Sequence, residues 1–203
     1  MIGLFLGEKK LPLEILKSLK KKKIKYFIID LSKNNKFKKD RNSYFINIGK
    51  FGKILELIKS KKCKKVLFAG NIVKPRISKL KLDLKGIYYI PRVIKASKLG
   101  DAAILKVLIN ILSENKIKVI KLNSYNPALT LRKGCFTKLK PTLTDKITIK
   151  KGIKILNKFN AFNHVQALVV NNQKIISFEK RKGTKDMLKS IRKNKLKNKL
   201  LLK

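Results

Sequence analysis

Apolar residues in the first two-thirds of the chain follow two spacings that alternate. Short continuous runs, rich in β-branched and aromatic side chains, are typical of buried strands, whereas an apolar residue at every third or fourth position is typical of a helix with one buried face. The predicted strands are residues 2–7, 25–30, 44–49, 65–70 and 117–122, and the predicted helices are residues 11–22, 50–62 and 100–116. Strands that alternate with helices favour a parallel sheet covered on both faces.

The pattern changes near residue 123. Residues 123–145 contain two prolines and several threonines without a sustained period, which suits a connection between domains. The elements predicted after it are a helix over 144–159, a hairpin around Asn171-Asn172 and a final helix over 186–195. We therefore expect an α/β domain over residues 1–125 and a smaller, incomplete α+β domain over residues 126–203.

The charge of the chain is strongly positive, at +42, with 53 Lys and Arg against 11 Asp and Glu. Only six of the basic residues are Arg, whereas contacts that read bases favour the planar Arg fork. The lysines occur in nearly every segment beside many Ile and Asn, and all three have A/T-rich codons. A base bias of the genome therefore explains the charge without a nucleic-acid partner, although so basic a surface attracts anionic lipid headgroups and phosphorylated ligands.

Several classes of protein and site are not favoured. The apolar runs are too short to cross a bilayer and the first residues do not form a signal peptide, so we expect a cytoplasmic protein. Cys63 and Cys135 lie far apart and are expected to be ordinary reduced thiols. His164 is the only histidine, has no evident Ser, Cys or Asp partner, and is expected to be structural. No carboxylate cluster predicts an all-protein metal cage, but Mg²⁺ needs only one or two carboxylates plus substrate phosphates.

Two loops are expected at the carboxyl ends of parallel strands, where open α/β sheets bind ligands. The first follows Gly7, which permits either a tight turn or the close approach of a phosphate. The second contains Gly70 and Asn71, which suit a turn and a ligand contact equally well. The first loop lacks the closely spaced glycines of a dinucleotide site, so a nicotinamide-dependent dehydrogenase is the weakest alternative.

Two expected helix starts carry a similar ambiguity. Asp101 after Gly100, and Thr184 after Gly183, are residues suited to cap a helix. The same geometry points backbone N–H groups outward, where they could hold a phosphate, and the lysines around Thr184 would add positive charge. Both interpretations stay open at this point.

Five segments of the chain are more specific together than any one of them is alone. The most telling are GKFGKI at residues 49–54 and FAGN followed by KP at residues 68–75. The others are GLFLGEKKLP at residues 3–12, GDAAIL at 100–105 and GTKDML at 183–188. In this order they resemble the UDP-2,3-diacylglucosamine pyrophosphatase family of bacterial lipid A biosynthesis, of the type with two unlike domains, and the resemblance extends through essentially the whole chain.

The resemblance implies a fold, a reaction and a location. It implies a Rossmann-like first domain and a second domain of unusual topology, with the substrate held in the cleft between them. The implied reaction is Mg²⁺-dependent hydrolysis of the pyrophosphate of UDP-2,3-diacylglucosamine to UMP and 2,3-diacylglucosamine 1-phosphate. The enzyme would meet this amphiphilic substrate as a peripheral protein at the inner face of the bacterial inner membrane, and a homodimer is an open alternative.

The resemblance also carries a set of substrate-binding residues onto this chain. The glycines and the asparagine among them are expected to hold sugar or phosphate through backbone and amide groups. The acidic residues and the glutamine are expected to orient substrate or to support the cleft, and no catalytic or metal-binding residue is assigned. The set is Gly7, Gly70, Asn71, Gly100, Asp101, Gln166, Glu179, Gly183 and Thr184.

The chain departs from the family pattern in each of these loops. Residues 8–10 are Glu-Lys-Lys where the family is richer in glycine. The family's Gly-Asp-Asp has Ala102 as its third residue here, which removes one carboxylate. The family's Glu-Gly-Thr-Asp begins with Lys182 and ends with Lys185, and Asp186 follows one place late.

Family chains also continue past the position of Lys203. That further segment contains an Arg-x-Asp-Leu-Pro passage whose Asp is thought to serve the metal and the chemistry. We therefore expect this chain to be a fragment of a longer enzyme, with an inactive UDP-sugar-binding protein as the first alternative. A basic nucleic-acid-binding protein is the second alternative, and its affinity would fall steeply with salt.

Overall fold

The computed structural model describes residues 1–73, 77–122, 131, 134–159, 165–180, 183–192 and 196–203. The chain divides into two compact units. The first consists of Met1–Arg92 and Leu108–Arg132, and the second of Val93–Val107 and Lys133–Lys203. A domain boundary after residue 125 stays a prediction, since residues 123–130 lie outside the described part of the chain.

The first unit is built on a five-stranded parallel sheet with the order β3-β2-β1-β4-β5. This order places β1 at the centre and reverses direction beside it, as in Rossmann-like folds. Its inner strands read as continuous apolar runs because both faces of the sheet are covered. The α/β, Rossmann-like prediction is confirmed. The strands are β1 (Ile2–Leu6), β2 (Tyr26–Asp30), β3 (Ser43–Phe45), β4 (Lys65–Ala69) and β5 (Lys118–Val119).

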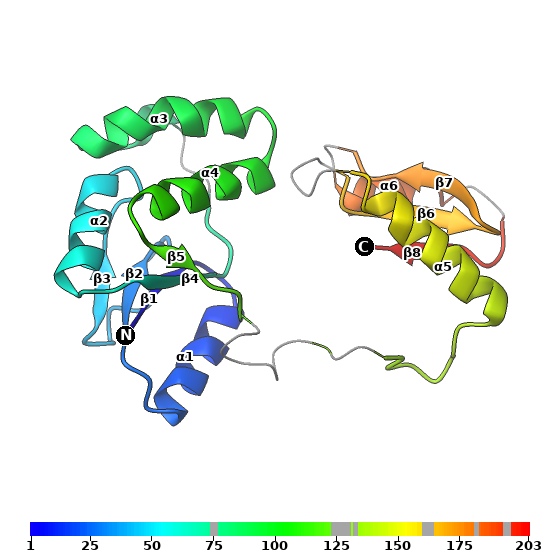
Figure 1. Cartoon of the computed structure of the whole chain (residues 1–203), viewed down its shortest axis with the longest axis horizontal. Coiled ribbons are helices and arrows are strands. Elements are labelled where there is room, and N and C mark those ends of the chain that lie inside the picture. Colours follow the sequence, from blue (N-terminus) through cyan, green and yellow to red (C-terminus); the bar gives the residue numbers. More distant parts are fainter. Residues whose placement is uncertain (74–76, 123–130, 132–133, 160–164, 181–182, 193–195) are drawn as a thin grey trace. The chain divides into compact units, whose positions relative to one another are not determined.

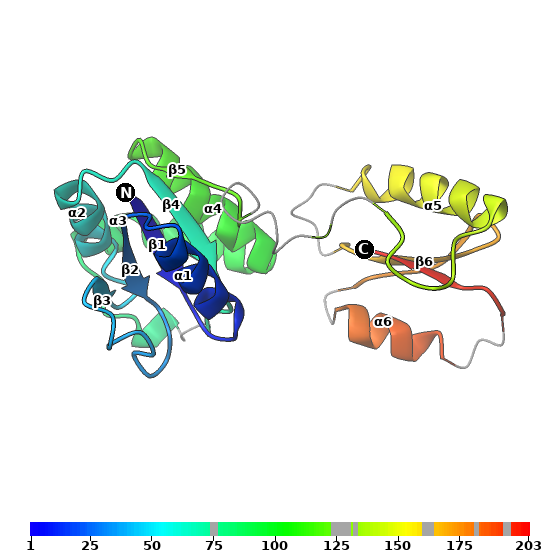
Figure 2. The same ribbon diagram turned by 90° about the horizontal axis from the view of Figure 1, so that it is seen from below.

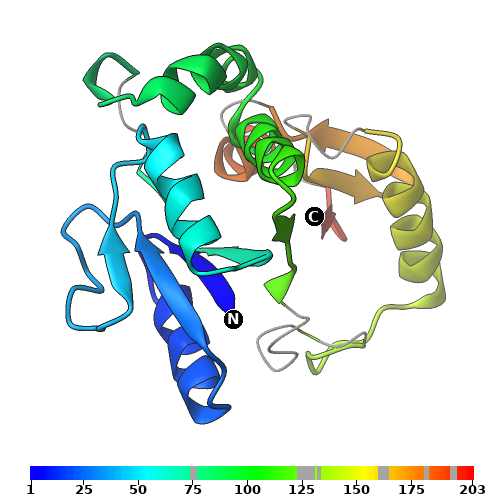
Figure 3. The ribbon, with the colours of Figure 1, turned by 60° about the vertical axis from the view of Figure 1, so that its left-hand side comes forward.

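Helices cover both faces of this sheet (Figures 1 and 2). One helix, α1, lies on one face, where Ile15, Leu16 and Leu19 pack against the strand residues Leu4 and Leu67. Two helices, α2 and α4, cover the other face, and α3 lies outside them (Figures 1 and 3). The helices are α1 (Leu11–Lys21), α2 (Phe51–Ser60), α3 (Leu84–Ser97) and α4 (Asp101–Glu114), and a short 3₁₀ helix η1 spans Ile77–Lys79.

Helix α3 was not predicted, although Leu84, Ile87, Tyr88 and Pro91 keep helical spacing. Pro91 inside the helix removes one backbone donor, and Gly86 in its first turn lowers helix propensity. Its start is fixed instead by Asp83, whose carboxylate accepts a hydrogen bond from the Gly86 amide at 2.8 Å. The same carboxylate accepts hydrogen bonds from the amides of Gly52 and Lys53, both at 3.1 Å, in the first turn of α2. One side chain therefore caps two helices.

The second unit contains a three-stranded antiparallel sheet with the order β7-β6-β8. Its two helices cover opposite faces of the sheet, α5 on one side and α6 on the other (Figure 2). A capping box between Thr142 and Asp145 starts α5, and Met187 of α6 is buried against Ala167 and Val169. The elements are α5 (Leu143–Leu156), β6 (Leu168–Asn171), β7 (Lys174–Phe178), α6 (Thr184–Ser190) and β8 (Leu200–Leu202).

The predicted hairpin and the two predicted helices of this unit are present, with small shifts. The hairpin turn has positive φ at Asn172 and Gln173, as a tight two-residue turn requires, so it lies one position later than predicted. Strand β8 was not predicted, and it is a three-residue edge strand.

Cys63 is buried and Cys135 is exposed, and both are free thiols. None of the helices in the described ranges combines the length and apolar character needed to cross a membrane.

The shared cap predicts a pH-dependent stability. Burial raises the pKa of Asp83, but the hydrogen bonds from the Gly86, Gly52 and Lys53 amides lower it by more than burial raises it. The pKa of Asp83 therefore lies below its usual value. Such a group stabilises the fold above the unfolded pKa, about 4, and this contribution is lost as the pH falls through the lower folded value. We expect Asp83→Ala to cost about 1–2 kcal/mol at pH 7, and the cost to fall as the pH is lowered below the unfolded pKa, so that it is smaller at about pH 3.

Denaturant titrations of wild type and variant at both pH values measure this difference. Glu56→Ala is the control, because it removes an exposed carboxylate from α2, one of the two helices that Asp83 caps, without removing an amide partner. It should change the free energy of unfolding by no more than about 0.5 kcal/mol. An Asp83→Ala deficit that is equally large at both pH values would contradict the capping role.

Candidate functional site

The loops after β1 and β4 meet at the carboxyl edge of the sheet, at the point where the strand order reverses. Gly7 follows β1, and Gly70 and Asn71 follow β4. The two loops are joined by backbone hydrogen bonds from Gly7 N to Ala69 O (2.9 Å), from Glu8 N to Asn71 O (2.7 Å) and from Asn71 N to Glu8 O (3.2 Å). In open α/β sheets this reversal point is where ligands bind. The structure therefore brings together three of the nine candidate residues at that position.

The close approach of these loops requires glycine. A Cβ on Gly7 would lie 2.3 Å from Asn71 O, and one on Gly70 would lie 2.5 Å from Glu8 O. Gly70 also has a φ of +88°, which other residues rarely adopt. The turn interpretation of both glycines is thus correct, and it does not exclude a ligand beside them.

The donors left at this edge are side chains and the start of α1 rather than the amides of the two glycine-containing turns. The N–H groups of Gly7 and Asn71 donate within the protein, so they do not face a phosphate as the sequence interpretation expected. Asn71, Lys9 and Lys10 are exposed. Among the described residues, no side chain caps the N-terminus of α1, which begins at Leu11. An asparagine amide, two ammonium groups and a helix N-terminus together suit an anion.

Asp30 also lies at this edge and is the residue that sequence reasoning missed. It ends β2, the place where dinucleotide-binding folds hold a ribose, and it is fully buried. Its carboxylate accepts hydrogen bonds from the amides of Ser32 (2.8 Å) and Phe37 (3.0 Å). Its position at a strand end was the available signal. Both oxygens are used to shape the following loop, so Asp30 positions that loop rather than binding a ribose.

The loop shaped by Asp30 is tied to the loop after β1. Lys33 N donates to Glu8 Oε1 at 2.8 Å, and Lys36 Nζ donates to Lys9 O at 3.1 Å. Lys9 has a φ of 83°, in the left-handed region. The backbone that carries the exposed Lys9 and Lys10 is therefore hydrogen-bonded both to the loop after β2 and to the loop after β4.

A second cluster lies in the second unit around Glu179. This carboxylate is buried and accepts hydrogen bonds from Gln166 N at 3.0 Å and from Thr184 Oγ1 at 2.7 Å. Lys203 Nζ in turn donates to Thr184 Oγ1 at 2.7 Å. A Cβ built on Gly183 would lie 4.0 Å from Glu179 Oε1. The four candidate residues of the second domain are thus adjacent, and the backbone amide of Gln166 rather than its exposed side chain makes the contact.

The expected cap at Thr184 is not the residue that caps the helix. Gly183 is the N-cap of α6, and the Thr184 hydroxyl donates to Glu179 instead of capping the helix. Helix α4 begins at Asp101, and Gly100, with a φ of 113°, precedes it. The Thr184 capping prediction was wrong by one position, whereas the role of Asp101 stays a prediction. His164 and Lys182 lie outside the described residues.

The described carboxylates do not assemble a metal cage. No group of three or more His, Cys, Asp or Glu side chains suited to a metal ion occurs among the described residues. In the two clusters, both oxygens of Asp30 and both of Glu179 already accept hydrogen bonds from protein groups. These residues do not fit a metal site, and neither carboxylate is assigned to one.

Comparison with known proteins finds two family models that together match most of the chain. The family model for the LpxI N-terminal domain matches residues 1–129, and the model for the LpxI C-terminal domain matches residues 132–203. The chain belongs to the LpxI family. The family resemblance inferred from the sequence motifs is thereby confirmed.

One relative in the LpxI family is a longer protein, and this chain matches part of it. The chain is 27% identical over 146 residues to the UDP-2,3-diacylglucosamine pyrophosphatase LpxI of Caulobacter vibrioides. The match covers 72% of this chain and 52% of that protein. This LpxI-family chain therefore spans about half the length of its relative.

The contact between the loops after β1 and β4 predicts that a single added methyl group has a strong effect on stability. Gly7→Ala would place Cβ against Asn71 O, so the Glu8–Asn71 hydrogen bonds must lengthen. We expect a loss of about 1–3 kcal/mol in the free energy of unfolding, measured by denaturant titration. Lys10→Ala, an exposed change three residues away, is the control and should cost less than about 0.5 kcal/mol.

The Glu179 cluster predicts a difference between two substitutions of Thr184. Thr184→Val keeps the shape but removes the donor to Glu179, and we expect a cost of about 1 kcal/mol or more. Thr184→Ser keeps the hydroxyl and should retain most of that stability. Thermal unfolding of both variants tests this, and a larger loss for Thr184→Ser than for Thr184→Val would show that the methyl group rather than the hydrogen bond matters.

Proposed function

We propose that this chain takes part in hydrolysis of the pyrophosphate bond of UDP-2,3-diacylglucosamine, which yields UMP and 2,3-diacylglucosamine 1-phosphate for lipid A biosynthesis. The observation that carries the proposal is the match of both LpxI domain models, in order, across residues 1–129 and 132–203. The name of the Caulobacter vibrioides relative supplies the substrate. Membership of a hydrolase family supports an enzyme rather than a structural protein.

The first cluster supports binding of the pyrophosphate at the carboxyl edge of the sheet. The substrate carries two phosphate charges next to each other, and the exposed Lys9 and Lys10 flank the uncapped start of α1. Asn71 adds an amide that can donate to phosphate or to a sugar hydroxyl. Cations placed there would bind the pyrophosphate of the substrate. They would also stabilise the negative charge that develops as water attacks phosphorus and the bond to the bridging oxygen breaks.

The second cluster supports a positioning role. Glu179 holds the backbone of Gln166 and the hydroxyl of Thr184, so it fixes the segment before β6 against the start of α6. The exposed side chain of Gln166 is then presented from a fixed backbone. We assign Gln166, Gly183 and Thr184 to substrate binding, and Glu179 to supporting them.

A Mg²⁺ requirement is part of the proposal and rests on the family resemblance. When bound, the ion would supply charge neutralisation for the phosphate oxygens. Asp101 and Asp186 are the carboxylates that start α4 and α6 and are the first to test as its ligands. We also propose that the protein acts at the inner face of the bacterial inner membrane, because the net charge of +42 favours an anionic surface.

A binding protein without catalysis is the second candidate. The specific observation in its favour is that each carboxylate oxygen of Asp30 and Glu179 already accepts a hydrogen bond from a protein donor. Such a protein would bind a UDP-sugar and release no UMP.

The deciding experiment measures UMP release from UDP-2,3-diacylglucosamine by the purified chain with Mg²⁺, with EDTA as the control. Metal-dependent release supports the hydrolase. Binding of the substrate by calorimetry without release supports the second candidate. A chain that is folded but neither binds nor hydrolyses the substrate would exclude both.

Substitutions of Asn71 test the site itself. Asn71→Ala removes an exposed amide without disturbing the backbone bonds, and we expect about a tenfold loss of substrate affinity or turnover. Asn71→Asp keeps the size but places a negative charge beside the pyrophosphate, and its loss should be larger.

Asn42→Ala is the matched control for Asn71→Ala. Asn42 is also exposed, but it precedes β3, whereas Asn71 follows β4 at the carboxyl edge. Its affinity and turnover should equal those of the wild type. Unchanged affinity and turnover in both Asn71 variants, measured in this chain or in a full-length relative, would remove the residue from the site.

A further inference from the structure

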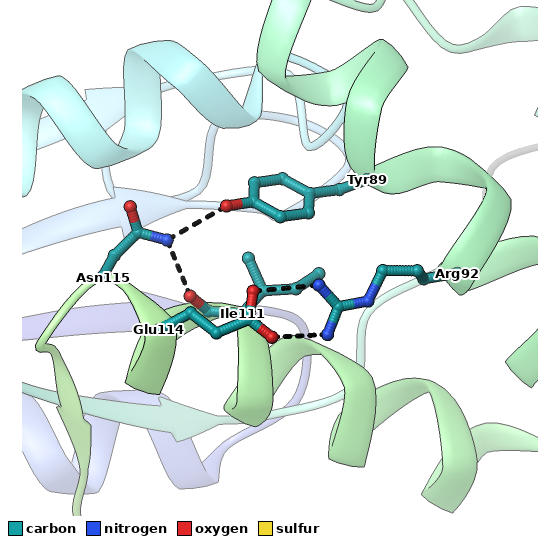
Figure 4. Close-up of polar contacts among 5 residues, drawn as sticks. All are labelled: Tyr89, Arg92, Ile111, Glu114 and Asn115. Carbon is teal, nitrogen blue, oxygen red and sulfur yellow. Dashed lines mark hydrogen bonds and ion pairs between the residues drawn. The ribbon is translucent and has the colours of Figure 1, made fainter.

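The first part of helix α3, Leu84–Arg92, belongs to the first unit, and one of its faces is held firmly against the end of α4. Arg92 forms two hydrogen bonds with Glu114, at 2.9 and 2.6 Å, and the Asn115 amide donates to Tyr89 OH at 3.2 Å (Figure 4). Asn115 also donates to Ile111 O at 2.7 Å, which fixes the amide. Tyr89 and Arg92 are three positions apart, so one stripe of α3 faces α4.

Other contacts hold the start of the helix in the same orientation. The Tyr89 ring meets the Phe51 ring edge-on, with centroids 5.7 Å apart. Asp83 accepts hydrogen bonds from both Gly86 of α3 and Gly52 of α2. Rotation of α3 about its axis would break the contacts to both neighbouring helices, so the face that it turns outward is fixed.

The outward face of α3 is apolar. Leu84, Ile87 and Tyr88 are 86%, 57% and 72% exposed, and their spacing of three and four places them on one stripe. Pro91 continues the same stripe and is also exposed. A stripe of large apolar residues on a helix that is fixed in this orientation costs free energy in water and is typical of an interaction surface.

The surroundings of the stripe are strongly basic. Lys81 and Lys85 flank its start and are exposed. Lys85 also lines a depression of 670 Å³ that runs beside α2 towards the turn after α4. One carboxylate, Glu56, lines this depression, and the nearby Glu114 is paired with Arg92. The lysines that line it are Lys59, Lys62, Lys64, Lys85 and Lys116.

We propose that the stripe of Leu84, Ile87, Tyr88 and Pro91 docks onto an anionic lipid bilayer, with the surrounding lysines contacting the headgroups. An apolar helix face bordered by lysines is the pattern of interfacial helices, and each lysine near an anionic surface adds attraction. A second copy of the chain fits less well, because a two-fold contact would bring two basic rims together. The inference deepens the proposed function, on which it rests for the lipid nature of the substrate.

Vesicle flotation with the full chain tests the docking surface. The probes are vesicles of phosphatidylcholine alone and vesicles that also contain phosphatidylglycerol. We expect binding to the anionic vesicles, reduced by salt, and about a tenfold loss for the double variant Leu84→Ser with Tyr88→Ser.

The matched control is the double variant Leu143→Ser with Ile147→Ser. These residues also lie four positions apart on a helix, α5, and are 78% and 55% exposed. This variant should bind as the wild type does. Equal losses in both pairs, or a loss only in the control pair, would overturn the assignment to α3.

A fluorescent reporter gives a second readout that does not depend on loss of binding. The chain contains no Trp, so Tyr88→Trp provides a single indole on the stripe and Leu143→Trp a single indole on α5. Anionic vesicles should shift the emission of the first to shorter wavelength and leave the second unchanged. No shift for Tyr88→Trp would overturn the proposal. The proposal would also be overturned if sedimentation without lipid showed that the chain self-associates and that this association causes the shift.

These readouts are separate from the test of hydrolysis. UMP release is measured on detergent-dispersed substrate, which needs no bilayer. A chain that hydrolyses the substrate but does not bind anionic vesicles overturns the docking surface alone. A chain that binds the vesicles through α3 but neither binds nor hydrolyses the UDP-sugar overturns the proposed function alone.

Discussion

The pairing of β1 with parallel neighbours on both sides is the constraint on which the first unit depends. All five residues of β1 are buried, and the strand pairs with β2 on one side and β4 on the other. A central strand flanked in this way forces the chain to leave its carboxyl end into α1 while β4 ends beside it. The loops after β1 and β4 must therefore meet, and the glycines at positions 7 and 70 allow them to meet within hydrogen-bonding distance. The candidate anion site is a direct consequence of this strand order.

The few carboxylates of this basic chain are used mainly to organise backbone. Asp30 fixes the loop after β2, Asp83 caps α2 and α3, and Glu179 joins the segment before β6 to α6. Each accepts hydrogen bonds from backbone amides, which a lysine cannot do. Asp40 accepts a backbone bond from Asn42 as well, but it also accepts from the Lys20 and Tyr26 side chains. Burial raises the pKa of Asp40, but these hydrogen bonds outweigh burial and lower it. With 11 acidic residues against 53 basic ones, there are too few carboxylates to give each lysine a partner of its own.

Local pattern was sufficient to predict the strands β1, β2 and β4 and the helix α2, whose buried residues Phe51, Ile54, Leu55 and Ile58 keep a regular spacing. Helix α3 was not predicted, although its apolar residues keep helical spacing. Gly86 and Pro91 weaken the local signal, and the contacts of Asp83 that stabilise the helix start reach 31 residues back along the chain, to Gly52. The edge strand β8 is too short for any period to show. For the site, the rule that parallel strands end at one edge brought Gly7 and Asn71 together in advance. Glu179 and Thr184 entered the candidate set only through the family resemblance, and their hydrogen bond was not predicted, since no local period connects them.

The backbone of the first loop is closed by its own hydrogen bonds. A glycine-rich loop can offer free amides to a phosphate, but here the amides of Gly7 and Glu8 donate to Ala69 and Asn71. The family resemblance leads one to expect more glycine at the positions that Glu8, Lys9 and Lys10 occupy. Glu8 holds the neighbouring loop through the Lys33 amide, while the two lysines remain exposed. The groups that this loop presents to an anion are therefore ammonium groups, which carry full charges, rather than the amides of Gly7 and Glu8, which carry partial ones.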